Sequence, residues 1–127
     1  MATVYREPNQ VKWIGVRPGH NGEEIIKNID LAASAIVYTV PADKLLLLFD
    51  WCIGIIQNVN NGSRLQLRTD VPVVYAELAY VTSGLNTAGQ VASQSLNIPI
   101  EIPESYDIYV TCTVVTRGYI HGVLIDA

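Results

Sequence analysis

Charged side chains are scarce in this sequence, because Asp, Glu, Lys and Arg make up only 16% of its 127 residues. A typical soluble domain contains about 25% of these residues. The twelve acidic and eight basic groups leave a net charge of −4. Nucleic-acid binding requires a basic surface, so this composition argues against that class of partner. A low charged fraction is also typical of the cores of protein interfaces.

Histidine and cysteine are too few for the common metal and catalytic sites. His20 and His121 lie far apart in the chain, with no thiol or carboxylate at metal-ligand spacing. Cys112 could act as a nucleophile with His121 as its base, but its position on the apolar face of a strand favours packing. The sequence also lacks a G-x-S-x-G motif, a calcium-binding loop and a glycine-rich phosphate loop. We therefore predict no catalytic residue, no cofactor and no metal, and expect that the protein is not an enzyme.

The two cysteines, Cys52 and Cys112, each lie in a segment predicted to be a strand. Buried free cysteine behaves as a small hydrophobic residue, and we predict core thiols at both positions. A disulfide between them stays an open alternative, because sequence spacing alone does not decide it.

Long apolar segments are absent as well. No apolar run approaches the roughly 18 residues of a membrane-spanning helix. The first ten residues, MATVYREPNQ, lack the apolar stretch of a secretory signal. We therefore expect a protein that is made in the cytoplasm, stays soluble and does not contact a membrane. Its length is that of one domain.

Helix signals are missing, and strand signals take their place from residue 35 onwards. Apolar and polar residues alternate in residues 63–69, 91–102 and 106–115, as in half-buried antiparallel strands. We predict turns at residues 41–43, 60–62, 103–105 and 117–118, with Asn60-Asn61-Gly62 as a hairpin turn. Seven or eight short strands separated by such turns indicate an all-β fold, an antiparallel β-sandwich or jelly roll.

The most apolar stretch of the chain is residues 44–56. Its length would suit a helix, but its isoleucines, its glycine and the lack of a capping box favour a strand. Gly54 suggests a bulge within this strand. Residues 45–49 are all apolar, so both faces of the strand should be dry. The sandwich core can cover one face, and the N-terminal arm or a symmetry-related copy would have to cover the other.

Residues 1–30 differ from the rest and are predicted to form an extended N-terminal arm, followed by a sandwich domain at residues 31–127. Pro8 and Pro18 bracket a short strand-like stretch at residues 11–16, and proline disfavours both helices and the interior of a sheet. The large apolar side chains of the arm should pack on its own domain, on a neighbouring subunit or on a partner. The predicted assembly contacts are Tyr5, Val11, Trp13, Val16, Leu46 and Leu48.

Three segments carry a family resemblance: residues 40–46 (VPADKLL), residues 100–110 (IEIPESYDIYV) and residues 118–123 (GYIHGV). Together they resemble small jelly-roll proteins of tailed-bacteriophage virions, such as head decoration (cement) proteins and fibre domains. The resemblance covers residues 35–126 and excludes the arm. It implies a non-enzymatic virion subunit that forms a homo-oligomer, with a trimer favoured. It also implies that the arm docks onto the major capsid protein or another virion protein.

Two other functions stay open from the sequence. A carbohydrate- or receptor-binding domain of a tail or head fibre would need an exposed aromatic platform, whereas aromatic residues in strands also serve simply for packing. An enzyme of the cupin type would need clustered histidines on facing strands, which two distant histidines do not supply. The candidate platform residues are Trp51, Tyr75, Tyr80, Tyr106, Tyr109 and Tyr119.

Overall fold

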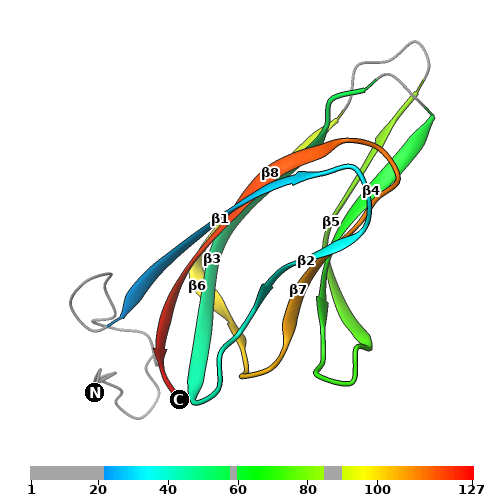
Figure 1. Cartoon of the computed structure of the whole chain (residues 1–127). Helices are drawn as coiled ribbons and strands as arrows, with labels where there is room; N and C mark the ends of the chain where they lie inside the picture. Colours follow the sequence, from blue (N-terminus) through cyan, green and yellow to red (C-terminus); the bar gives the residue numbers. More distant parts are fainter. Residues whose placement is uncertain (1–21, 58–59, 85–89) are drawn as a thin grey trace.

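The computed structural model describes residues 22–57, 60–84 and 90–127, which fold into eight β-strands (Figure 1). Within these residues there is no helix that could cross a membrane. The strands are β1 (Glu23–Leu31), β2 (Ala35–Thr39), β3 (Lys44–Ile55), β4 (Asn61–Arg68), β5 (Val74–Ser83), β6 (Val91–Ile102), β7 (Asp107–Thr111) and β8 (Thr116–Asp126).

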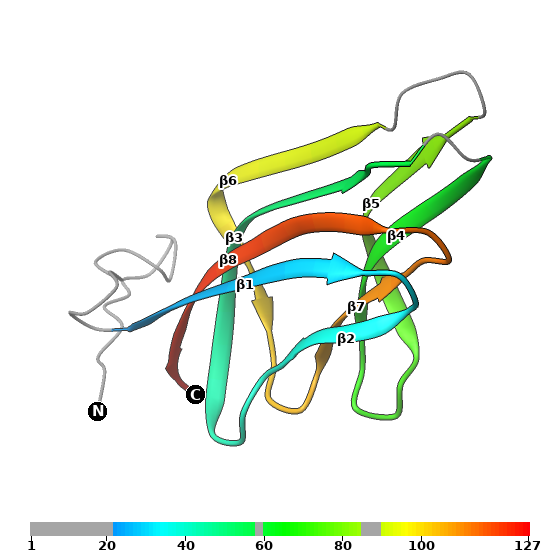
Figure 2. The same cartoon turned by 45° about the horizontal axis from the view of Figure 1, so that its top comes forward.

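The strands form two four-stranded antiparallel sheets, ordered β1-β8-β3-β6 and β2-β7-β4-β5 (Figure 2). The pairing is nested, because β1 pairs with β8, β2 with β7, β3 with β6 and β4 with β5. The chain is thus arranged as one long hairpin that has been rolled up, which is the jelly-roll topology. The predicted all-β sandwich is confirmed, with eight strands.

The core lies between the two sheets and is built from the alternating apolar residues of facing strands. Leu46 and Leu48 of β3 meet Leu65 and Leu67 of β4 in one cluster of buried side chains. Burying a side chain of this size is worth about 1.5–3 kcal/mol. In β4 the period-2 pattern that predicted the strand therefore also determines which residues face the core.

Strand β3 is a strand and not a helix, as predicted, but its bulge lies at Phe49 and not at Gly54. The register of β3 against both β6 and β8 shifts between Leu48 and Asp50, whereas Gly54 is regularly paired. Before the bulge, even-numbered residues such as Leu48 face the core. After the bulge, which adds one residue, odd-numbered residues such as Trp51 face the core.

Two of the predicted turns are confirmed and lie against each other. Asp43 and Ser105 adopt left-handed conformations with φ of 62° and 68°, as expected for turn residues. The backbone N–H of Asp43 donates to the Glu104 carboxylate at 2.6 Å, and that of Ser105 donates to the Val40 carbonyl at 2.8 Å. These bonds join the β2–β3 and β6–β7 connections at one end of the sandwich.

The other two turn predictions were wrong. Residues 60–62 do not form a hairpin turn, because Asn61 and Gly62 begin β4, and β3 and β4 belong to different sheets. Residues 117–118 do not form a turn either, because both lie inside β8. Gly118 is glycine because the backbone of β3 passes so close that a Cβ atom would lie 1.8 Å from the Cys52 carbonyl oxygen.

The boundary of the sandwich also differs from the prediction. Residues 23–30, predicted as part of the N-terminal arm, belong to β1, which pairs with β8 along its whole length. Ile25 and Ile29 point into the core from this strand. The sandwich therefore includes residues 23–30, and the predicted short strand at residues 11–16 lies outside the described residues.

Candidate functional site

Two predicted assembly contacts, Leu46 and Leu48, face the sandwich core and are completely buried. They cannot contact a partner, so this part of the prediction was wrong. The sequence shows that both faces of β3 are apolar but does not show which residues face the other sheet. The remaining predicted contacts lie outside the described residues, namely Tyr5, Val11, Trp13 and Val16.

The outward-facing residues of β3 form a second apolar cluster with β8, which we call the outer cluster. Leu47 pairs with Val123 and Leu45 pairs with Ile125, and Phe49 packs against the same group. Leu47 is 0% exposed within the single chain. The prediction that both faces of this strand are dry is therefore confirmed at Leu47, whereas Leu45 and Phe49 are only partly buried. Burial of Leu47 does not require a second copy of the protein.

The surface candidate is a group of exposed apolar side chains at the β4–β5 turn, which we call the apolar tip. It consists of Val71, Val73, Val74 and Tyr75. Val71 is 69% exposed and Val73 is 57% exposed, and the other two are exposed by nearly half. Single exposed apolar residues are common, but a contiguous group of them is typical of an interaction surface.

The apolar tip is held in a defined conformation by hydrogen bonds and ring packing. The Thr69 N–H donates to the Val73 carbonyl at 2.9 Å, and the Val73 N–H donates to the Thr69 hydroxyl oxygen at 3.3 Å. Pro72 between them restricts the backbone further. The Tyr75 ring packs edge-to-face on Tyr106, with ring centroids 5.6 Å apart. A surface ordered in this way pays little entropy when it binds a partner.

The electrostatic surroundings of the apolar tip also suit a dry contact. Partial burial and the neighbouring Tyr106 raise the pKa of Tyr75 above its ordinary value of 10.0. Tyr75 is therefore neutral at physiological pH. Residues 71–75 include no charged side chain, and the exposed Asp70 precedes them. Interface cores are depleted in charge in the same way.

One signal for the apolar tip is visible in the sequence. Pro72 interrupts residues 71–81 and predicts that pairing starts after it, and the structure confirms this, because β5 begins at Val74. Proline cannot donate to a sheet, so apolar residues on either side of it belong to a connection and tend to be exposed.

The aromatic residues considered as a sugar platform do not form one shelf. Trp51 is buried in the core, and Tyr75 and Tyr106 pack on each other at the apolar tip. Tyr109 is covered by the Arg68 guanidinium, whose central carbon lies 3.7 Å from the ring centroid. The half-exposed Tyr80 is considered below with the pocket that it lines.

Cys52 and Cys112 are both free thiols in the structure. Cys112 is part of the core, as predicted, and its Sγ lies 3.9 Å from the Leu31 carbonyl. Cys52 is only half-buried. Its neighbours Trp51 and Ile53 face the core, and because side chains alternate along a strand, Cys52 faces the outer side of the sheet. The prediction of a core thiol was therefore wrong for Cys52.

His121 lies on the outer face of the first sheet between two carboxylates. Its Nδ1 is 2.8 Å from Asp50 Oδ2, and its Nε2 is 3.3 Å from Glu24 Oε1. The interactions of His121 are thus with acids on β3 and β1, whereas Cys112 lies in the core. In the described part of the chain, no group of three or more His, Cys, Asp or Glu residues is arranged to hold a metal ion.

No protein-family model matches this sequence, and no curated protein is significantly similar to it.

Proposed function

We propose that the protein is a non-enzymatic structural subunit of a bacteriophage virion, of the capsid decoration type. In this role it self-associates through the apolar tip and docks through its N-terminal segment. The observation that carries the proposal is the ordered, uncharged and exposed group of Val71, Val73, Val74 and Tyr75. The jelly-roll topology supports it, because viral capsid domains commonly use this fold. The family resemblance of residues 35–126 points the same way.

Self-association through the apolar tip has a clear physical reason. Fully burying an exposed valine side chain is worth about 1.5–3 kcal/mol. The three valines of the tip are 45–69% exposed, so each would contribute part of this free energy when a second copy covers it. A second copy carries the same apolar surface, and homo-oligomers usually close around a rotational symmetry axis, which brings equivalent surfaces together. Tips that meet around a threefold axis would produce the trimer that the resemblance implies.

The N-terminal segment is proposed as the tether to the capsid shell. The described chain begins at Gly22, which lies directly against the outer cluster, since a Cβ atom there would be 2.3 Å from Val123 Cγ1 and 3.2 Å from Ile125 Cγ2. The described chain therefore begins beside the first sheet, whereas the apolar tip belongs to the second sheet. Docking and self-association would then use different surfaces of the subunit.

This proposal is tested by the composition of purified particles. We expect mass spectrometry of phage particles from lysates that carry the gene to show the protein in stoichiometric amounts relative to the major capsid protein. Removal of residues 1–21 should leave a folded protein that no longer sediments with the particles. A protein that stays entirely in the particle-free fraction would contradict a virion role.

A further inference from the structure

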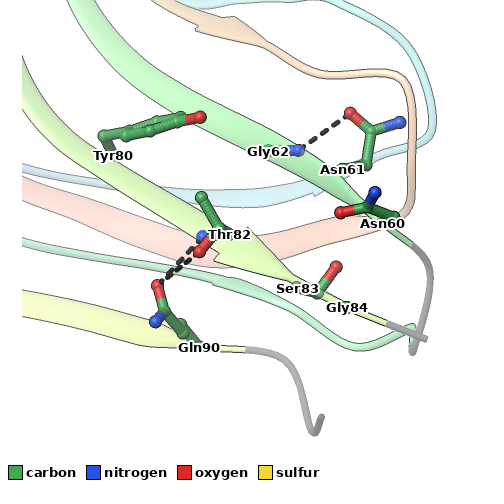
Figure 3. A pocket seen from close by; sticks show the side chains of 8 residues that line it. All are labelled: Asn60, Asn61, Gly62, Tyr80, Thr82, Ser83, Gly84 and Gln90. Atoms are coloured by element: carbon green, nitrogen blue, oxygen red, sulfur yellow. Dashed lines mark hydrogen bonds between the residues drawn. The ribbon is translucent and has the colours of Figure 1, made fainter. Parts of the chain in front are cut away.

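A pocket of about 460 Å³ opens at the end of the β4–β5 pair that is opposite to the apolar tip (Figure 3). β4 runs from Asn61 at the pocket to Arg68 beside the tip, and β5 returns antiparallel to it. Pockets of this volume accommodate small organic ligands. The pocket is lined by Asn60, Asn61, Gly62, Tyr80, Thr82, Ser83, Gly84 and Gln90.

The chemistry of the pocket is polar but uncharged. Among the residues that the structure describes, its lining consists of amide side chains, hydroxyl groups, two glycines and one aromatic ring, with no Asp, Glu, Lys, Arg or His. Amides and hydroxyls both donate and accept hydrogen bonds, so they suit a ligand that also does both. A phosphate, a carboxylate or an amine would find no opposite charge in this lining.

Gln90 is fixed in the pocket by Thr82. Its Oε1 accepts hydrogen bonds from the Thr82 backbone N–H at 3.0 Å and from the Thr82 hydroxyl at 3.1 Å, as Figure 3 shows. The backbone N–H of Gln90 in turn donates to the backbone carbonyl of Thr82 at 3.3 Å. Because the amide oxygen is engaged, the amide nitrogen is the group that Gln90 can offer to a ligand. A side chain fixed in advance loses little freedom on binding.

Tyr80 is held in place by two residues of β4. The Arg64 guanidinium carbon lies 4.1 Å from the ring centroid, and the same guanidinium pairs with Glu77 at 2.8 Å. Gly62 leaves room for the edge of the ring, because a Cβ atom there would be 2.9 Å from Tyr80 Cε2 and from its hydroxyl oxygen. The ring nevertheless remains 50% exposed.

We propose that this pocket binds a neutral saccharide. Sugars have apolar C–H faces edged by hydroxyl groups, and a tyrosine ring with amide donors and acceptors around it complements both features. Asn60 contributes an exposed side-chain amide at the rim, on the connection that leads into β4. The proposal does not depend on the virion role, because it uses the end of the sandwich that is remote from the apolar tip.

The test uses the full chain, fluorescently labelled, on an array of neutral and acidic glycans, followed by calorimetric titration of the glycan bound best. We expect a neutral glycan to bind. Asn60→Ala should weaken binding about fivefold, the equivalent of one net hydrogen bond of about 1 kcal/mol. Tyr80→Ala should abolish detectable binding, whereas Tyr119→Ala, a matched exposed tyrosine on the other sheet, should leave the affinity unchanged.

Gly62→Ala keeps the test decisive if Tyr80→Ala does not fold. The added methyl group meets the far end of the exposed Tyr80 side chain, which can swing away without disturbing the strands. We therefore expect this variant to retain the wild-type circular dichroism spectrum and to lose glycan binding. The proposal is overturned if no glycan binds the folded protein, if only acidic glycans bind, or if peptides bind in place of glycans. It is also overturned if Asn60→Ala and Gly62→Ala bind the glycan as tightly as the wild type does.

Discussion

Gly118→Ala is expected to lower the free energy of unfolding by more than about 3 kcal/mol, at the upper end of the cost of overpacking a protein interior. The new Cβ atom would lie 1.8 Å from the Cys52 carbonyl oxygen, 2.7 Å from the Cys52 carbonyl carbon and 3.0 Å from the Ile53 Cα atom. All three are backbone atoms of β3, so no side chain can rotate away. The central strands β3 and β8 would have to separate, which would break the hydrogen bonds between them.

The matched control is Gly54→Ala, on the neighbouring strand in the same part of the sheet. Its Cβ atom would lie 3.0 Å from the Val91 side chain, 3.3 Å from the Gln90 carbonyl oxygen and 3.7 Å from the Val91 Cα atom, where the chain enters the edge strand β6. We expect it to cost about 1 kcal/mol or less, since a small shift of Val91 relieves the contact. Urea unfolding of both variants measures the difference. Equal midpoints for the two variants would show that the close approach of β8 to β3 is wrong.

The double variant Val71→Asp, Val73→Asp is expected to weaken self-association at least about a hundredfold. Each substitution removes roughly 1.5 kcal/mol of apolar burial at the apolar tip, which is about tenfold in the dissociation constant. The new carboxylates of facing copies would also repel each other. The fold should be unaffected, because both side chains are largely exposed and project from the turn.

Val91→Asp is the control for this variant. Val91 is 69% exposed, the same fraction as Val71, but it lies at the start of β6 beside the pocket end of the sandwich. Sedimentation velocity over a range of concentrations should show wild-type association for Val91→Asp and monomers for the double variant. If both proteins associate alike, the apolar tip is not the interface.

Much of the fold could be predicted because the strands alternate strictly between apolar and polar residues. β4 is an example, since Leu65 and Leu67 face the core as the period requires. In β6 the period fails, because Ile102 is buried whereas Ile98 is 60% exposed, where the register against β3 shifts. β1 was missed because Lys27 occupies the inward-facing position between Ile25 and Ile29. Because β1 is an edge strand, the Lys27 side chain can reach solvent past the Tyr38 ring, with its Nζ 5.7 Å from the ring centroid. A lysine at an inward-facing position interrupts the apolar alternation that would otherwise have predicted this strand.

The candidate surfaces were harder to predict than the fold. The phase of β3 depends on the bulge at Phe49, which no residue type marks, so Leu46 and Leu48 were assigned to the wrong face. The pocket assembles residues from β4, from β5 and from the connection before β6, which only the sheet order brings together. In the sequence these residues look like separate polar turns. They come together only in the fold, because a jelly roll pairs segments that are far apart in the chain.

The most direct test of a building-block role is the mass of the intact protein in solution, measured by light scattering at micromolar concentration. One chain has a mass of 13.9 kDa. We predict a discrete, larger species with the mass of a trimer, which dissociates on dilution. A mass of one chain at every concentration would contradict self-association, and the exposed valines of the β4–β5 turn would then need another explanation.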